Sequence, residues 1–160
     1  MASVTVVPFS IEPHHIEGTA ARPSPAALLQ ALADEAVASA ARALTRSHIS
    51  SKVDLAPAKA GMPVYRLTGT VRIPLFLPED EQLHREIGRS EPFVKASILL
   101  LDPDGRELRK VESILAWEDL HGPDGAPLAT DGPVESVLRQ AVRQAVEDAV
   151  DHLGPIPTRN

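Results

Sequence analysis

The chain contains no cysteine and few aromatic residues, and both absences exclude classes of protein. Without cysteine it has neither a disulfide framework nor a thiolate zinc site. It has three Phe, one Tyr and one Trp, and its formal net charge is −6. Nucleic-acid binding needs cationic surface and stacking rings, so this composition predicts no nucleic-acid partner. The longest apolar runs, such as Ile98 to Leu101, are too short to cross a bilayer, so we expect no transmembrane segment.

The length of the chain is that of one domain, because two separate cores would each be marginal within 160 residues. We therefore expect a single α/β domain over residues 1–160, with a flexible tail at 157–160. The chain begins Met-Ala-Ser and continues into β-branched residues, without the pattern of a signal peptide. This start indicates the cytoplasm if Met1 is the native first residue.

Strict alternation of apolar and polar residues predicts a long strand over 64–77, with one dry face and one wet face. Shorter β-branched or apolar segments predict further strands at 3–11, 93–101 and 107–118, and a weak one at 51–56. The sequence Asp-Pro-Asp-Gly at 102–105 has type I turn chemistry, which predicts a hairpin between the last two strands.

Two segments have the apolar spacing of amphipathic helices, 25–46 and 134–153. Ser24 and Asp131 are their expected N-caps, and Gly154 is expected to follow the second helix.

The connections at 12–22, 78–92 and 119–133 are rich in proline, glycine and charge, and we expect loops there, the middle one with a short helix. The element order β-α-(β)-β-β-β-α predicts an α+β fold. In it, an antiparallel or mixed sheet of four or five strands packs on two helices.

No motif predicts catalysis, a metal site or a cofactor. The adjacent His14 and His15 point apart in an extended chain and lack a third ligand nearby in sequence. The acidic segment 79–81 lacks the ligand spacing of a calcium loop, and no phosphate-binding glycine loop or nucleophile elbow is present. We therefore expect a protein that is not an enzyme and holds neither metal nor cofactor.

The wet, solvent-facing side of strand 64–77 is the strongest candidate for a functional surface. Its members are Arg66, Thr68, Thr70 and Arg72, joined by Lys95 and Ser97 of the next strand if the strands pair in sequence order. Together they predict a flat, mildly basic patch. Such a face is often only the solvated side of an antiparallel sheet. Our hypothesis is that it docks a protein partner, or a second subunit.

Four segments, in this order, resemble a bacterial envelope family that includes the TolB amino-terminal domain, CsgG and LpoB. The first is the opening strand 4–9, which ends in Pro-Phe, and the second is the helix 25–46. The third is Tyr-x-Leu-x-Gly-x-Val at 65–71, and the fourth is the hairpin 94–108 with Leu-Leu-Asp before its glycine. The likeness extends over residues 3–118.

The resemblance implies a non-catalytic assembly factor that acts through protein contacts, including contacts with its own copies, in the periplasm or cell envelope. The chain departs from the family in having no lipobox cysteine, no pore-forming alternation at 78–92 and no propeller. The alternative is a cytoplasmic small-ligand-binding or regulatory module, with its cleft between the helices and the loops at 12–23 and 119–133.

Overall fold

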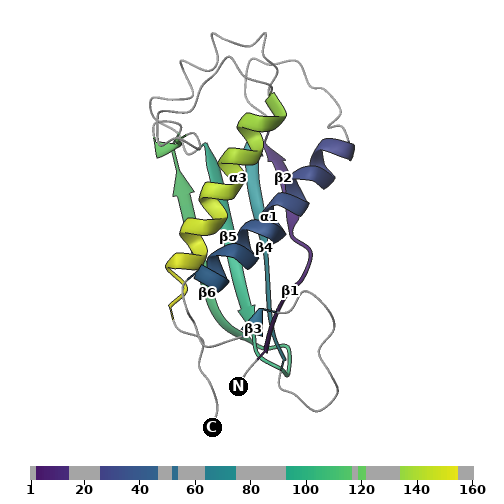
Figure 1. The fold of residues 1–160 in the computed structure, drawn as a ribbon, viewed down its shortest axis with the longest axis vertical. Helices are drawn as coiled ribbons and strands as arrows, with labels where there is room; N and C mark the ends of the chain where they lie inside the picture. Colours follow the sequence, from purple (N-terminus) through teal and green to yellow (C-terminus); the bar gives the residue numbers. More distant parts are fainter. Residues whose placement is uncertain are drawn as a thin grey trace.

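The computed structural model describes residues 3–14, 26–46, 52–53, 64–74, 93–116, 119–121 and 134–154. They form one sheet with both helices on the same face, as Figure 1 shows. The α+β class and the element order predicted from the sequence are confirmed. The elements are β1 (Ser3–Val6), β2 (Ser10–His14), α1 (Ala26–Arg46), β3 (Lys52–Val53), β4 (Val64–Pro74), β5 (Val94–Leu101), β6 (Glu107–Leu115) and α3 (Val134–Asp151).

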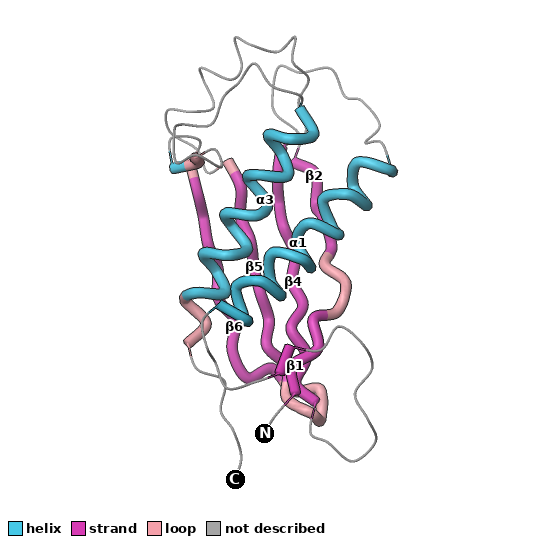
Figure 2. The backbone as a smooth tube through the Cα atoms, viewed as in Figure 1, coloured by secondary structure: helices cyan, strands magenta, loops and turns pink. Residues whose placement is uncertain are grey.

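The sheet is mixed, with strand order β3-β1-β4-β5-β6. β1 runs parallel to both β3 and β4, and β2 continues along β4 in the same direction as β1 (Figure 2). The remaining pairs, β4 with β5 and β5 with β6, are antiparallel. The predicted hairpin is confirmed: Gly105 N–H donates to the Asp102 carbonyl at 2.9 Å, and Gly105 has a φ of +85°.

The amino-terminal strand is interrupted by one extra residue. Val6 pairs with Leu67 and Ser10 with Thr70, so residues 7–9 lie opposite only two residues of β4. Such a bulge bends the strand and resumes pairing beyond it. The prediction of one strand over 3–11 followed by a loop at 12–22 is therefore wrong at this point, because the second half pairs with β4 as far as His14.

Pro8 lies within the bulge, where its missing N–H costs no ladder hydrogen bond. Its carbonyl accepts a hydrogen bond from Thr68 Oγ1 at 3.1 Å, and Val7 N–H donates to the Leu67 carbonyl at 2.9 Å. The Val7 N–H and the Pro8 carbonyl are thus both hydrogen-bonded. The Leu67 carbonyl of β4 also keeps a partner despite the interruption.

Phe9 closes the bulge on its buried side by lying over Gly69. A Cβ placed on Gly69 would come within 2.9 Å of Phe9 Cε2 and 2.4 Å of the Ser97 carbonyl oxygen. Both distances are shorter than real Cβ contacts, so the β4 backbone approaches its neighbours as closely as only glycine allows. The Pro-Phe and Gly positions of the motif are therefore two halves of one packing contact.

The two helices meet through small side chains. Ala36, Ala40 and Ala43 of α1 are fully buried, and α3 buries Ala141, Ala145 and Ala149 together with its valines and Leu138. The helices converge at their carboxyl ends (Figure 1). There Arg42 Nε lies 3.8 Å from Glu147 Oε1, and Arg46 Nη2 lies 3.2 Å from Asp151 Oδ2. Alanine at these positions permits the close approach of the two helices.

The carboxyl end of α3 is attached to β6 by two polar contacts. Arg109 Nη1 donates to the Leu153 carbonyl at 2.8 Å, and Ser113 Oγ donates to Asp148 Oδ2 at 2.7 Å. Gly154 follows with a φ of +76°, the left-handed conformation expected of the residue that ends a helix. These contacts hold α3 in one position across β5 and β6.

Several predicted segments differ in extent or fall outside the described residues. Of the weak strand predicted at 51–56, the structure describes Lys52–Val53, which form β3, and β6 ends at Leu115 instead of 118. The connection 78–92, the tail 157–160, Asp131, most of 119–133 and residues 75–77 of the long strand lie outside the described residues. Among the described helices, none is both long and apolar enough to cross a membrane.

Candidate docking surface

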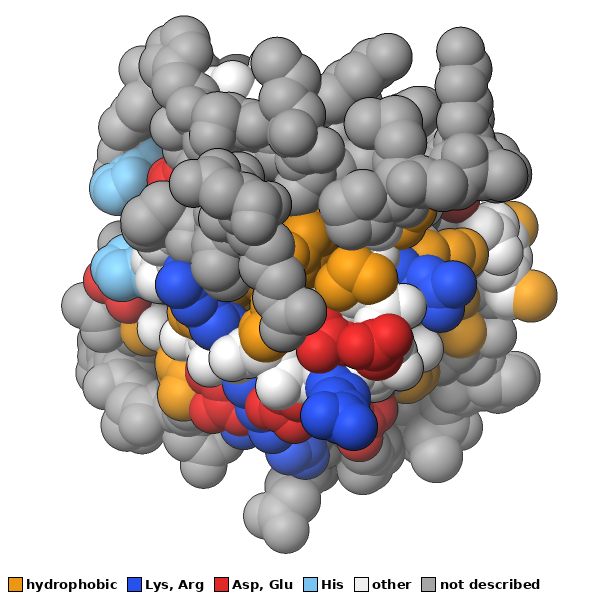
Figure 3. Space-filling model, turned by 90° about the horizontal axis from the view of Figure 1, so that it is seen from below, with side chains coloured by type: hydrophobic (Ala, Val, Ile, Leu, Met, Phe, Trp, Pro, Cys, Tyr) orange, Lys and Arg blue, Asp and Glu red, His pale blue; other side chains and the backbone are white. Residues whose placement is uncertain are grey.

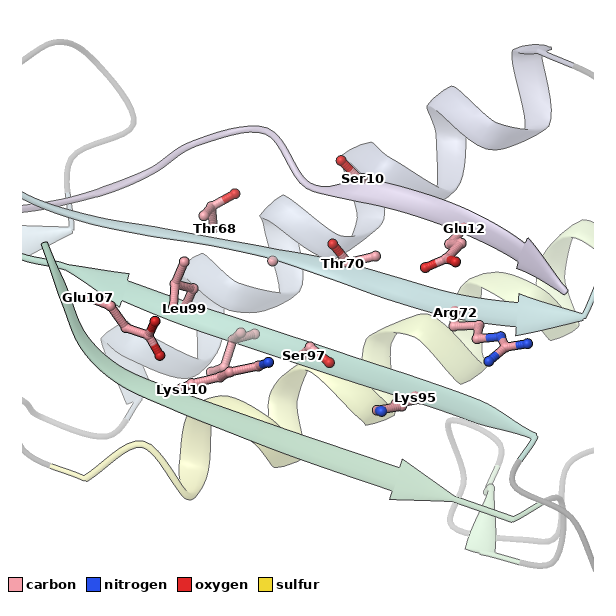
Figure 4. A pocket seen from close by; sticks show the side chains of 12 residues that line it. Ser10, Glu12, Thr68, Thr70, Arg72, Lys95, Ser97, Leu99, Glu107 and Lys110 are labelled. Carbon is pink, nitrogen blue, oxygen red and sulfur yellow. The ribbon is translucent and has the colours of Figure 1, made fainter. Parts of the chain in front are cut away.

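The face of the sheet opposite the helices is covered by no described element, and we call it the open face. Figure 4 looks onto it, with the labelled side chains in front of the strands and the helices behind. Polar and charged side chains of four strands point outward there. They are Ser10 and Glu12 of β2, Arg66, Thr68, Thr70 and Arg72 of β4, Lys95 and Ser97 of β5, and Glu107, Lys110 and Glu112 of β6.

The strand register brings the predicted residues together. Thr70 lies opposite Ser97, and Arg72 lies opposite Lys95. The assumption that the long strand pairs with the next one in sequence is therefore confirmed. The same four β4 side chains alternate with Tyr65, Leu67, Gly69, Val71 and Ile73, of which all but the glycine are buried.

The charge of the open face is mixed, because β2 and β6 bring carboxylates beside the predicted cations. Glu12 lies opposite Arg72 in the register, and Glu112 Oε1 lies 3.6 Å from Lys95 Nζ and 3.9 Å from Lys110 Nζ. Ser97 Oγ adds a hydrogen bond to Glu112 at 3.5 Å. Figure 3 views the end of the molecule from below instead of the open face, and acidic and basic side chains lie next to one another there too. The mildly basic patch predicted from β4 and β5 alone is therefore part of a patterned surface, on which basic and acidic side chains lie next to one another.

A shallow hollow of about 530 Å³ lies over the middle of the open face, between β2 and β6. Hydroxyls line its centre and charged groups its ends, and it is open to solvent along the sheet. Sites for small molecules usually enclose most of the ligand's surface. A shallow hollow across four strands does not enclose a ligand in this way. Its shape suits a broad partner better than a small molecule.

One predicted member of the patch also has a structural task. Thr68 Oγ1 donates to the Pro8 carbonyl, so its hydroxyl supports the bulge as well as the surface. Arg66 differs from it, because this exposed side chain makes no ion pair with another described residue. Arg66 is therefore the better probe of binding, since its replacement leaves the described contacts of the fold in place.

Histidines and carboxylates offer no metal centre in the described part of the chain. No three or more His, Asp or Glu side chains there are grouped so that they could hold a metal ion. His14 ends β2, and His15, His48 and His84 lie outside the described residues. The His121 backbone bonds to the side chains of Gln140 and Gln144, which attaches the segment 119–121 to α3.

His152 is the titratable group whose surroundings favour its charged form. The pKa of His152 is raised from its ordinary value of 6.5, first by a hydrogen bond between Nδ1 and the Asp148 carbonyl, 2.7 Å away, and then by the negative charge of Asp148. Desolvation lowers this pKa in part, and the charge of Asp151 raises it by less than that. The imidazolium therefore interacts favourably with the acidic end of α3.

We expect replacement of His152 by glutamine to lower stability only at acidic pH. Because the folded-state pKa is raised, the stabilising contribution is fully present below the unfolded value of 6.5 and is lost as the pH rises through the folded pKa. The difference in melting temperature between the parent and His152→Gln should be small, since the side chain is exposed, and should vanish at alkaline pH. Thermal melts from pH 5 to 9 measure it, and a difference that grows with pH would contradict the assignment.

The ligand cleft of the alternative hypothesis cannot be placed on described residues alone. Of the loop at 12–23, residues 12–14 belong to β2, and of the loop at 119–133, residues 119–121 pack on α3. A smaller hollow of about 260 Å³ beside the end of α3 is lined mainly by the carboxylates Asp119, Glu147, Asp148 and Asp151. Arg46 and Gln144 also line this hollow, but Arg46 pairs with Asp151 at 3.2 Å and Gln144 bonds to the His121 backbone.

Comparison with known proteins assigns no family. No protein-family model matches the chain, and no curated protein matches it. Among solved structures, a PelC variant dodecamer from Paraburkholderia phytofirmans is 19% identical, with 91% of this chain and 83% of that chain covered and a TM-score of 0.41. An uncharacterized protein is 15% identical, with 96% and 89% covered and a TM-score of 0.39. Similarity at these TM-scores carries no argument about this chain.

Proposed function

We propose that this chain is a non-catalytic interaction domain that docks a protein partner on the open face of its sheet. The observation that supports the proposal is the open face itself: a broad, patterned surface that no described element covers. Enclosed ligand sites bury their ligand, whereas protein interfaces are flatter and extend over about 800 Å² on each partner. A surface built from four adjacent strands has the extent for the second kind of contact.

The charges of the face define the chemistry of the partner. Arg66 lies near one end of β4 and Arg72 near the other, with Thr68 and Thr70 between them in the strand. A partner segment with carboxylates at both ends and hydrogen-bonding groups at its middle would match this row. Because charged pairs at an interface set orientation and association rate, the two arginines would fix how the partner lies along the strand.

An assembly role in the bacterial cell envelope is part of the proposal, and its support is the resemblance in sequence to the TolB, CsgG and LpoB family. Within the structure, the shared positions Phe9, Gly69 and the 102–105 turn serve the fold. They therefore indicate a shared architecture, and the binding residues have to be argued from the open face itself.

A double charge reversal, Arg66→Glu with Arg72→Glu, is expected to abolish partner capture. Tagged parent and variant chains would be used as baits in lysate of the source organism, with the retained proteins quantified by mass spectrometry. Arg139→Glu with Arg143→Glu on the exposed side of α3 is the matched control, since it changes the net charge equally on the opposite face. A partner retained by the parent and the control, and lost with the open-face variant, would then be purified and titrated directly.

Two outcomes would overturn the proposal. One is a purified partner whose affinity is the same for the parent and for the open-face variant. The other is a rise in melting temperature of the parent, and not of the variant, with a small metabolite in a thermal-shift screen. Such a rise would assign the open face to a ligand, because a molecule that binds only the folded state must stabilise it.

A further inference from the structure

β6 is the last strand of the sheet, so one side of its backbone faces away from β5 and pairs with no other described strand. It also carries the two large apolar side chains that are exposed among the described residues, Leu108 at 38% and Ile114 at 53%. Unpaired edges bind other strands readily, and proteins usually protect them with charge, proline, bulges or short length. β6 has nine residues and no proline, its bulge lies at one end, at Leu108, and its exposed charges at Lys110 and Glu112 are of opposite sign.

The exposed side chains in the regular part of β6 form a self-complementary series. Lys110, Glu112 and Ile114 follow one another at every second position, whereas the exposed Glu107 and Leu108 lie at a bulge, where the register with β5 shifts between Arg109 and Glu107. When the regular part pairs antiparallel with its own copy about Val111, position 110 lies opposite 112. Each lysine then meets a glutamate. Directly opposed pairs of opposite charge stabilise antiparallel strands.

We propose that two copies of this chain associate through their β6 edges, antiparallel and related by a two-fold axis at Val111. The occupant of the edge is therefore a second copy, and the sheet continues from one subunit into the other. The two-fold symmetry follows because one surface meets itself. The interface involves the backbone edge of β6, so it goes beyond the proposed docking on the open face and does not include Arg66 or Arg72.

The charges select this register over its neighbours. Centring the pair on Lys110 would place that lysine opposite its own copy, and centring it on Glu112 would place two glutamates opposite each other. Like charges directly opposed are destabilising. A register slip of a single residue would turn the outward side chains of one strand toward the helix side of the other. Centring on Val111 is thus the arrangement in which the charged pairs are matched.

The charges also provide the test, because two weakened variants should repair each other. Lys110→Glu gives a strand with two glutamates, and Glu112→Lys gives a strand with two lysines, so each pairs badly with itself. Mixed together they place glutamate opposite lysine at all four positions. We expect the parent to be a dimer in analytical ultracentrifugation, each variant alone to be monomeric, and an equimolar mixture to form a heterodimer. Arg143→Glu on α3 is the control and should remain dimeric.

General attraction between the variants does not explain such a rescue. Each change alters the chain's net charge of −6 by only two units, so both variants remain acidic and repel at long range. The rescue also shows that each variant is folded, since an unfolded edge could not pair. A parent that stays monomeric at every soluble concentration would overturn the proposal. So would a parent dimer that neither variant weakens, or variants that stay monomeric when mixed.

The absence of cysteine in the chain allows the register to be measured directly. Val111→Cys places the new thiols on the two-fold axis, where opposed Cα atoms of antiparallel strands are about 4.5–5.5 Å apart. That spacing lies within the range of a disulfide. Oxidation should therefore give a covalent dimer with Val111→Cys and none with Thr70→Cys on the central strand β4. Equal cross-linking of both variants, or none with Val111→Cys, would contradict the proposed axis.

Discussion

Replacing Gly69 by alanine is expected to lower the free energy of unfolding by about 3 kcal/mol, because one methyl group would have to enter a backbone contact. The added Cβ would lie 2.4 Å from the Ser97 carbonyl oxygen, 2.9 Å from Phe9 Cε2 and 3.2 Å from the Ile98 Cα. Two of these three atoms belong to the β5 backbone, which cannot rotate away. β4 and β5 must therefore separate locally, and the ladder between them weakens.

Urea denaturation and thermal melts would measure the loss. For a chain of this size, 1 kcal/mol corresponds to about 2–4 °C in melting temperature, so we expect a fall of about 6–12 °C. Gly105→Ala is the matched control, since it adds the same methyl group at a position where nothing lies within 4 Å. Its cost comes only from the φ of +85° and should be about 1–2 kcal/mol. Equal losses at both glycines would show that the Gly69 contact is loose.

Local patterns were sufficient for most of the fold. The helices 26–46 and 134–151 lie within two residues of their predicted limits, because the apolar spacing that marks each stripe is the spacing that buries it against the sheet. The hairpin was predictable for a similar reason. The Asp102 carboxylate accepts hydrogen bonds from the N–H groups of Asp104 and Arg106, at 2.9 and 2.8 Å. The turn is therefore stabilised by residues close together in sequence.

The extension of the first strand to His14 could not be predicted locally. The bulge at 7–9 depends on Phe9 meeting Gly69, a contact between residues sixty positions apart. Proline and glycine at 13 and 18 are ordinary loop signals, and they outweighed the pairing signal in the sequence. The parallel pairing of β1 and β2 with β4 determines how far the strand extends, and no local sequence pattern indicates that pairing.

The candidate surface was predicted only in part, because some of its residues are placed by pairing between strands that are distant in sequence. Alternation within one strand placed Arg66, Thr68, Thr70 and Arg72 on a common face, and the assumption that strands pair in sequence order placed Lys95 beside them. The carboxylates Glu12 and Glu112 were missed, since they reach the face only through the registers of β2 and β6. For Glu112 a signal was available: the alternation of exposed residues over 107–115 continues the face by one more strand.

Phe9→Ala is expected to have a larger effect than any surface change, at about 3–5 kcal/mol of unfolding free energy. The ring is buried and fills the space above Gly69, where β4 carries no side chain of its own. Its removal leaves a cavity beside a glycine, which has no side chain to fill the space. The bulge would also lose the anchor that returns the chain to pairing at Ser10. Thermal melts and urea titration should show the lower stability, and Phe9→Leu, which keeps most of the apolar volume, should cost less than about 1.5 kcal/mol.

The two large predictions are coupled, and the coupling tests the contact itself. In a Phe9→Ala background the new methyl group of Gly69→Ala no longer meets the ring, although it still meets the Ser97 carbonyl. The double variant should therefore lose less stability than the two single losses combined, by about 0.5–3 kcal/mol, as is usual for residues in contact. Strict additivity would mean that Phe9 does not lie on Gly69. In that case the Pro-Phe strand and the glycine strand would be independent features of the sequence, and the bulge would need another cause.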